Sequence, residues 1–157
     1  MKILLLAIGK TDEEYLITGI KKYVGRLGHY VSFEMKEIPD IRNRKTLSEE
    51  QQKKAESFLL LQQLQPGDHV VLLDENGKQY TSVAFSENME KLMASGAKRI
   101  VFVIGGPYGF AQEVYDKADA KLSLSPMTFS HQMVRLVFVE QLYRAFTILK
   151  GEPYHHN

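Results

Sequence analysis

The stretch Ile3-Leu4-Leu5-Leu6-Ala7-Ile8-Gly9 places six consecutive apolar residues and a glycine near the start of the chain. A continuous apolar run that ends at a glycine is typical of a strand buried on both faces of a sheet. A secretory signal peptide is the other interpretation of such a start. However, the apolar part is very short, and Lys10, Asp12, Glu13 and Glu14 stand where a cleavage region would be. We therefore interpret the run as a buried strand.

Helical and extended patterns alternate beyond this strand. Thr11 and Glu14 have the spacing of a capping box, and the apolar residues after them recur at helical spacing until Gly28. Residues 31–35 then alternate apolar and polar side chains, which predicts a strand with one buried face near a sheet edge.

Cap and turn signals divide the rest of the chain in the same way. Ser48 and Gln51 form a second capping box, and Ser82 is expected to cap a later helix. Asn76-Gly77 predicts a tight turn after a strand. The expected strands are residues 3–8, 31–35, 70–73, 100–104 and 122–125, and the expected helices are residues 12–27, 48–64, 82–93, 112–117 and 132–149. This alternation predicts an α/β fold, with a mostly parallel sheet of five to six strands and helices on both faces.

Composition narrows the class of protein. The chain has 157 residues, so we expect residues 1–157 to form one domain. Apolar residues make up 44% and charged residues 25%, which excludes wholesale disorder, and the net charge of +1 argues against binding polyanions by bulk charge. The absence of cysteine excludes disulfides and thiolate zinc sites and fits a cytoplasmic location. No apolar run reaches the roughly 18–20 residues of a membrane span, so no membrane partner is expected.

The last expected helix carries two apolar stripes. The first stripe, which includes Phe138 and Leu142, is ordinary core. A second stripe of Leu136, Val139 and Tyr143 is rotated away from it. Such a stripe needs a cover, and an identical chain in a homodimer is the favoured one. The alternative is a helix sandwiched inside its own domain.

Three loops leave the carboxyl ends of expected strands, where open parallel sheets bind ligands. They are Leu73-Asp74-Glu75-Asn76-Gly77, Gly105-Gly106-Pro107-Tyr108-Gly109 and Ser125-Pro126-Met127-Thr128-Phe129-Ser130-His131. Glycine lets backbone groups approach a flat ligand closely, and apolar loop residues suit the wall of a pocket.

Common nucleotide and metal motifs are absent from the sequence. The first strand is not followed by a glycine cluster of the dinucleotide type, and there is no GxxxxGK[ST] phosphate loop. His29, His69 and His131 are isolated in sequence, so no metal is expected. Ser125 and His131 lack the GxSxG context of a hydrolase.

Four segments carry a resemblance to a known family. They are Phe102-Val103-Ile104-Gly105-Gly106-Pro107-Tyr108-Gly109, Leu122-Ser123-Leu124-Ser125-Pro126-Met127-Thr128-Phe129-Ser130-His131-Gln132, Glu140-Gln141-Leu142-Tyr143-Arg144-Ala145-Phe146 and Gly151-Glu152-Pro153-Tyr154-His155. Together they closely resemble the ribosomal RNA large subunit methyltransferase H family, over essentially the whole chain. That family belongs to the SPOUT methyltransferases and methylates N3 of a pseudouridine in helix 69 of 23S ribosomal RNA, with S-adenosylmethionine as the donor.

The resemblance implies a C-terminal trefoil knot, which no sequence pattern predicts, and a homodimer. It also implies that S-adenosylmethionine lies against the three loops. The cofactor contacts that it implies are Leu73, Gly105, Leu124, Ser125, Pro126, Met127, Thr128 and Phe129.

On the substrate side, the resemblance implies roles for Arg144, Tyr154 and His155, with the tail of one subunit closing over the pocket of the other. Relatives often carry Lys or Arg after the Tyr-His pair, whereas this chain has His156 and Asn157. Arg144 is expected to stabilise negative charge on the target base, unless it only pairs with Glu140. Tyr154 is expected to stack on the base, unless it is a disordered tail residue.

The group that takes the N3 proton stays open among His155, His131 and a water molecule. For His131, capping of the last helix is the favoured role. Arg42-Asn43-Arg44-Lys45 and Lys21, Lys22 and Arg26 are candidate RNA contacts or simply solvated charges. Because the net charge is near zero, we expect the assembled ribosome, and not free RNA, to be the substrate. The alternatives are a SPOUT enzyme for transfer RNA or another ribosomal base, a non-enzymatic ribosome-binding protein, and a general nucleotide-binding protein.

Overall fold

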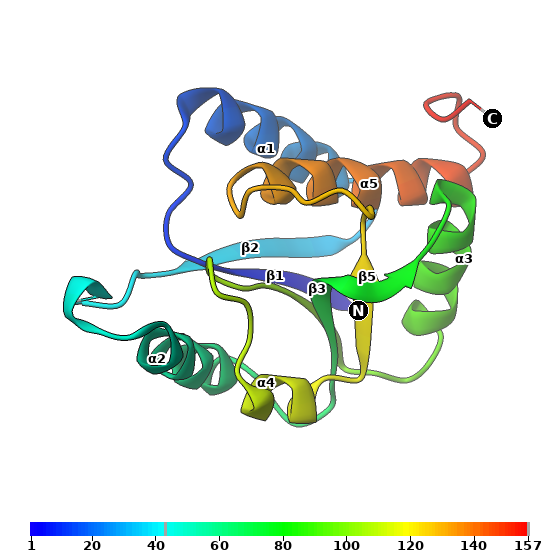
Figure 1. Cartoon of the computed structure of the whole chain (residues 1–157). Coiled ribbons are helices and arrows are strands. Elements are labelled where there is room, and N and C mark those ends of the chain that lie inside the picture. The colour runs from blue at the N-terminus through cyan, green and yellow to red at the C-terminus, as the bar shows by residue number, and fades with distance from the viewer. Residues whose placement is uncertain (43, 157) are drawn as a thin grey trace.

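Over the residues that the structure describes, 1–42 and 44–156, five strands form one all-parallel sheet in the order β2-β1-β4-β3-β5. Figure 1 shows this computed structural model of the chain. The strands are β1 (Lys2–Ile8), β2 (Ser32–Ile38), β3 (Asp68–Gln79), β4 (Arg99–Ile104) and β5 (Ala120–Ser123). The predicted α/β class with a parallel sheet is confirmed.

Burial explains the order of the strands. β1 and β4 pair at the centre, with Ile3 opposite Ile100 and Leu5 opposite Phe102, and nearly all of their residues are buried. β2 lies at an edge, and its residues alternate between exposed and half-buried over most of its length. Both the buried first strand and the one-sided edge strand were correctly predicted from their apolar patterns.

Helices cover both faces of the sheet, as predicted (Figure 1). They are α1 (Glu14–Leu27), α2 (Glu49–Gln62), α3 (Ser82–Met93), α4 (Gln112–Lys117) and α5 (Met133–Leu149), with a 3-10 turn η1 (Arg44–Thr46) before α2. On one face α1, α3 and α5 enclose a core in which the Phe102 and Phe138 ring centroids are 4.7 Å apart. On the other face α2 and α4 pack on Leu6 and Val103. None of these helices, within the described part of the chain, has the length and apolarity to cross a membrane.

The second apolar stripe of α5 is covered by the chain itself. Val139 is fully buried, and Leu136 packs against Gly19 of α1 so closely that a Cβ there would lie 3.0 Å from its Cδ1. Tyr143 contacts Tyr23 of α1, with ring centroids 5.8 Å apart. The alternative of a helix sandwiched inside its own domain is therefore present, with α5 between α1 and α3, while Leu136 and Tyr143 stay partly exposed. The stripe alone no longer requires a second copy, and the homodimer stays a prediction.

Two of the predicted helix caps are not formed. α1 begins at Glu14 without a side-chain cap, because the Thr11 hydroxyl donates instead to Glu37 Oε2 at 2.6 Å. The α3 cap is Thr81, whose Oγ1 accepts from the Ala84 amide at 3.0 Å, while Ser82 donates to Gln141 Oε1. The capping box predicted at Ser48, in contrast, is confirmed.

The carboxyl-terminal parts of β3 and β5 also differ from prediction. Asn76-Gly77 lies inside β3, where an irregularity between Leu73 and Lys78 replaces the expected tight turn. A Cβ on Gly77 would lie 2.6 Å from the Lys121 backbone, so glycine permits β3 and β5 to approach here. β5 ends at Ser123, two residues earlier than expected.

Candidate functional site

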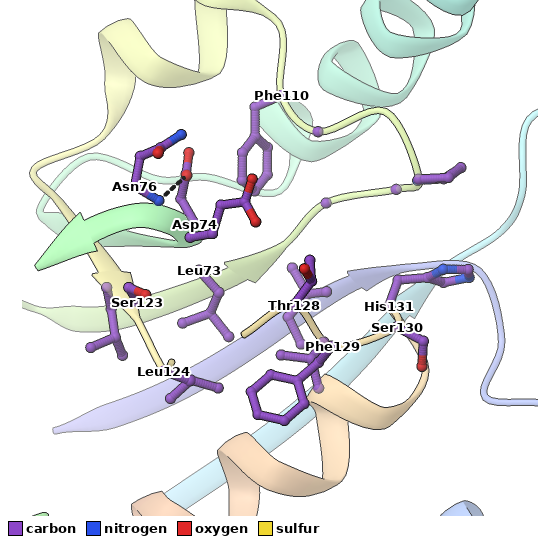
Figure 2. A pocket seen from close by; sticks show the side chains of 18 of the residues that line it. Leu73, Asp74, Asn76, Phe110, Ser123, Leu124, Thr128, Phe129, Ser130 and His131 are labelled. Carbon is purple, nitrogen blue, oxygen red and sulfur yellow. Dashed lines mark hydrogen bonds between the residues drawn. The ribbon is translucent and has the colours of Figure 1, made fainter. Parts of the chain in front are cut away.

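A cavity of about 590 Å³ lies at the carboxyl ends of β4 and β5 and beside residues 73–76 of β3, where the three predicted segments meet. Figure 2 shows side chains from these segments facing one hollow. The volume falls within the roughly 300–1,000 Å³ of small-molecule sites. The three predicted segments converge here, as the rule for open parallel sheets predicts, although the first of them belongs to β3 and is not a loop.

The β3 wall is held by Asp74. Its Oδ1 accepts from the Asn76 amide at 2.8 Å, which orders the irregular part of β3. Its Oδ2 accepts from the Tyr115 hydroxyl at 2.6 Å. Burial and this hydrogen bond raise the pKa of Tyr115 to about 12, so the phenol stays a neutral donor. Neither side chain was singled out from the sequence.

The β4 wall presents backbone at Gly105 and Gly106, where there is no room for a side chain, and Pro107, Tyr108 and Phe110 complete it. A Cβ on Gly105 would lie 3.1 Å from the Phe110 ring, and one on Gly106 would lie 2.5 Å from the buried Glu56 carboxylate. Behind the loop, the Ala111 amide donates to Ser57 Oγ at 3.1 Å. The glycines therefore let the loop lie flat between α2 and the cavity.

The third wall follows β5 and combines hydroxyl-ordered turns with apolar side chains. Ser125 Oγ accepts from the Met127 amide at 2.9 Å, and the Ser123 hydroxyl donates to the Ser125 carbonyl at 3.1 Å. Met127 is 78% exposed and Phe129 is 37% exposed. Such exposure of large apolar side chains at the rim leaves them available to cover a ligand.

Seven of the eight residues predicted to contact a cofactor line this cavity: Leu73, Gly105, Leu124, Ser125, Met127, Thr128 and Phe129. Pro126 is not among the lining residues. His131 lies at the rim, but it does not cap α5 through its side chain. That role belongs to Ser130, whose Oγ accepts from the Met133 amide at 3.0 Å.

Arg144, Tyr154 and His155 form a second cluster around Glu140. Glu140 Oε1 accepts from Arg144 Nη2 at 2.6 Å and from the Tyr154 hydroxyl at 2.9 Å. Arg144 Nη1 lies 3.1 Å from His155 Nδ1, and its guanidinium lies 4.8 Å from the centroid of the Tyr154 ring. The pair of Arg144 with Glu140 was considered from the sequence as the alternative to a role in charge stabilisation, and the pair is formed.

Hydrogen bonds order the polar groups of this cluster. Burial, with hydrogen bonds to Tyr23 and Glu140, raises the pKa of Tyr154 far above its ordinary value, so its hydroxyl stays protonated near neutral pH. Arginine has only donors, so His155 Nδ1 acts as the acceptor of the Arg144 bond. Tyr30 anchors the same tail through a 2.6 Å hydrogen bond to Glu152 Oε2.

The two groups of predicted site residues are far apart within one chain. Val134 at the start of α5 lines the cavity, whereas Arg144 lies ten residues later, about 15 Å along the helix axis. In Figure 1 the loop that leads into α5 lies at one end of this helix, and the C-terminus lies beyond the other end. The structure therefore unites the cofactor group and the tail group separately, and does not bring them together.

Groups that could hold a metal are not evident: the described residues contain no cluster of three or more His, Asp or Glu side chains placed for one. The most consequential residue that the sequence reasoning missed is Arg135, which is fully buried beside the cavity. The sequence pattern could have indicated a buried arginine, because Arg135 recurs at helical spacing with Phe138, Val139 and Leu142 on one buried face of α5.

Comparison with known proteins agrees with this geometry. The model of the family described as "Predicted SPOUT methyltransferase" matches residues 1–155. Curated relatives named "Ribosomal RNA large subunit methyltransferase H" are similar over 99% of both chains. The identity is 62% for the protein of Christiangramia forsetii, 60% for that of Parabacteroides distasonis and 54% for that of Bacteroides thetaiotaomicron.

Proposed function

The chain belongs to the SPOUT methyltransferase family and is a ribosomal RNA methyltransferase, and from this premise we propose that it methylates N3 of a pseudouridine in helix 69 of 23S ribosomal RNA. The observation that carries the proposal is the similarity, over nearly the full chain and at 54–62% identity, to proteins that share one name, ribosomal RNA large subunit methyltransferase H. A protein that had kept only the fold would not be expected to keep both the cavity and the tail cluster.

The proposed donor is S-adenosylmethionine, held in the cavity at the carboxyl edge of the sheet. When bound, it supplies a methyl group on a sulfonium, which is already activated for transfer. The residues present fit such a molecule: Gly105 and Gly106 offer backbone groups to a flat ring edge, while Leu73, Leu124 and Met127 offer apolar contact. We propose Pro126 as a contact through the loop that it shares with these residues.

A homodimer is proposed because one chain holds only half of the site. The cavity and the Arg144 cluster lie at opposite ends of α5, about 15 Å apart along its axis. A second copy related by two-fold symmetry places the tail of each chain over the cavity of the other. Alignment of the target base between these two halves supplies the rate enhancement, since the leaving group needs little help.

Within the tail cluster, the hydrogen bonds divide the roles. Arg144, oriented by Glu140, is placed to stabilise negative charge on the imide oxygens of the base. Tyr154 stays a neutral phenol and therefore stacks or donates, but does not take the N3 proton. His155 takes that proton only after its Nδ1 leaves Arg144, and His131 or a water molecule is the other candidate base.

The assembled ribosome is the proposed substrate, and a cytoplasmic location follows from that substrate. Arg42 and Lys45 are exposed after the carboxyl end of β2, and the cavity also lies at the carboxyl ends of the parallel strands. Lys21 and Lys22 are exposed on α1, and Arg26 stacks on Tyr23 at 5.6 Å. Asn43 and Asn157, which belong to the predicted basic loop and to the tail, lie outside the described residues. Family membership supports the proposed trefoil knot.

Mass spectrometry of ribosomal RNA tests the proposed reaction. The purified chain is incubated with labelled S-adenosylmethionine and with either intact ribosomes or naked 23S RNA from a strain that lacks this modification. We expect one methyl group on N3 of a pseudouridine, and much more of it on ribosomes. A methyl group on another base or on transfer RNA would contradict the proposed target, and equal labelling of naked RNA would contradict the proposed substrate.

A further inference from the structure

We propose that Arg135, assisted by Gln132, is a positioning residue that holds the third wall of the cavity against the end of β1. The inference rests on the proposed function of that cavity as the donor site. Arg135 touches neither the cavity nor the tail cluster, yet it lies next to Val134 and four residues after His131, both of which line the cavity. We name the contacts of Arg135 and Gln132 with residues 8–12 the strand-end latch.

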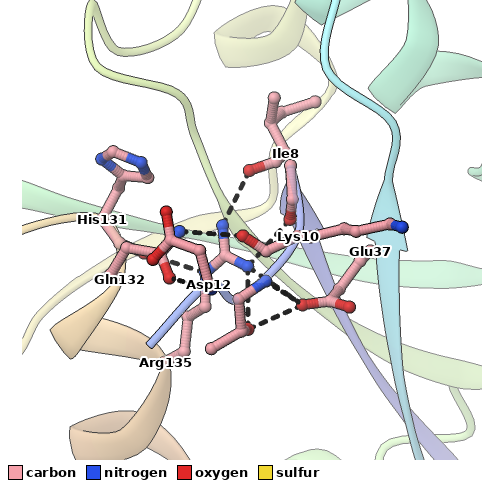
Figure 3. Close-up of polar contacts among 9 residues, drawn as sticks. Ile8, Lys10, Asp12, Glu37, His131, Gln132 and Arg135 are labelled. Atoms are coloured by element: carbon pink, nitrogen blue, oxygen red, sulfur yellow. Dashed lines mark hydrogen bonds and ion pairs between the residues drawn. The ribbon is translucent and has the colours of Figure 1, made fainter. Parts of the chain in front are cut away.

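Arg135 joins two distant segments of the chain through three carbonyls that accept from its guanidinium (Figure 3). Its Nη2 donates to the Ile8 carbonyl at 2.7 Å, and its Nη1 donates to the Gly9 carbonyl at 2.8 Å. Its Nε donates to the His131 carbonyl at 2.9 Å. The end of β1 and the end of the cavity wall, more than 120 residues apart in sequence, are therefore fixed to one planar group.

Gln132 repeats this connection one turn away. Its Nε2 donates to the Lys10 carbonyl at 3.0 Å, and its Oε1 accepts from the Asp12 amide at 3.0 Å. Gly9 adopts a φ of +81°, which only glycine takes readily, and its amide donates to the Ile38 carbonyl at 2.6 Å. Residues 8–12 thus form a stable platform to which the start of α5 is bound.

Burying the charged guanidinium of Arg135 costs free energy, so its presence here indicates a specific role. Burial lowers the pKa of the Arg135 guanidinium, and Glu37, with Oε2 at 3.2 Å from Nη1, acts in the opposite direction. An apolar side chain at this position would leave the Ile8, Gly9 and His131 carbonyls without this donor and would no longer tie the third wall of the cavity to the end of β1.

Lysine in place of Arg135 separates positioning from charge. Its ammonium keeps the charge but concentrates its donors at one point, so it does not span three carbonyls. We expect Arg135→Lys to raise the Kd for S-adenosylmethionine about tenfold or more, measured by titration calorimetry well below the unfolding temperature. We also expect faster hydrogen exchange at amides 124–131 without ligand.

Arg99→Lys is the matched control. Arg99 also forms a partly buried ion pair, with Nη2 2.7 Å from Asp68 Oδ2, and it also donates to a carbonyl, that of Gln63 at 2.9 Å. It lies at the amino end of β4, at the opposite edge of the sheet from the cavity. This variant should lose thermal stability while its Kd and the exchange of amides 124–131 stay those of the wild type.

The outcomes are distinguishable. If the wild-type chain does not bind S-adenosylmethionine, the proposed function of the cavity fails. If the wild type binds and Arg135→Lys binds equally well while losing stability as Arg99→Lys does, the latch is only structural and this inference is overturned. Should Arg135→Lys not fold, Gln132→Ala decides, because it breaks the latch without leaving a buried charge: an unchanged Kd overturns the inference and a raised Kd supports it.

Discussion

Gly105 shows how the absence of a single side chain shapes the proposed donor site. A Cβ here would lie 3.1 Å from the Phe110 ring, and its backbone φ is not in the left-handed region, so space is the only obstacle to a side chain. We expect Gly105→Leu to fold and to raise the Kd for S-adenosylmethionine about 10- to 100-fold, measured by calorimetry.

Gly25→Ala provides the control for this change, because no atom of the described residues lies within 4 Å of a Cβ at that position. It should leave the Kd unaltered and stabilise α1 by roughly 0.5–1 kcal/mol. An unaltered Kd in Gly105→Leu would remove the β4 loop from the donor site.

Tyr115 links the β3 wall to alkaline stability. Its pKa rises from the ordinary 10.0 to about 12 through burial and the hydrogen bond to Asp74. The folded state therefore binds the phenolic proton more tightly than the unfolded state, so this contribution is fully present below pH 10 and is lost as the pH rises toward 12. In Tyr115→Phe, the fall of the unfolding temperature between about pH 10 and 12 should be shallower than in the wild type. An equally steep fall would show that Tyr115 does not carry this dependence.

At the scale of elements, the patterns with purely local causes predicted the structure well. The apolar run of β1 and the six-residue α4 were placed from sequence, and so was the Ser48 capping box. Thr11 and Asn76-Gly77 were misread because distant partners decide their structure. Glu37 takes the Thr11 hydroxyl, and β5 pairs beside Gly77. No local pattern contains such partners.

The Ser48 cap has a measurable energy. Its Oγ accepts from the Gln51 amide at 3.1 Å, and the Ser48 amide donates to Gln51 Oε1 at 2.9 Å. Ser48→Ala should lower the free energy of unfolding by about 1 kcal/mol in urea titrations, without changing donor affinity. A loss near zero would mean that η1 and the preceding loop already fix the start of α2.

For the whole molecule, one sheet with two covered faces supports the proposal that residues 1–157 form one domain. The sequence predicted the cavity because the carboxyl ends of parallel strands always meet at one edge. The expected helix over residues 132–149 already separated Arg144 from the third loop. The sequence did not predict how the tail folds back onto Glu140 and Tyr30, because those contacts join residues far apart in the chain.

Two variants, each defective in one half of the proposed site, test the account most directly. Gly105→Leu damages the cavity and Arg144→Ala damages the tail cluster, so at a donor concentration near the wild-type Kd each homodimer should methylate ribosomes very slowly. In co-expressed mixtures, half of the dimers carry both variants, and each of these has one intact site, so activity should return to about a quarter of the wild-type value. If the mixed dimers form and remain inactive, cavity and tail do not act across the interface, and the central claim is wrong.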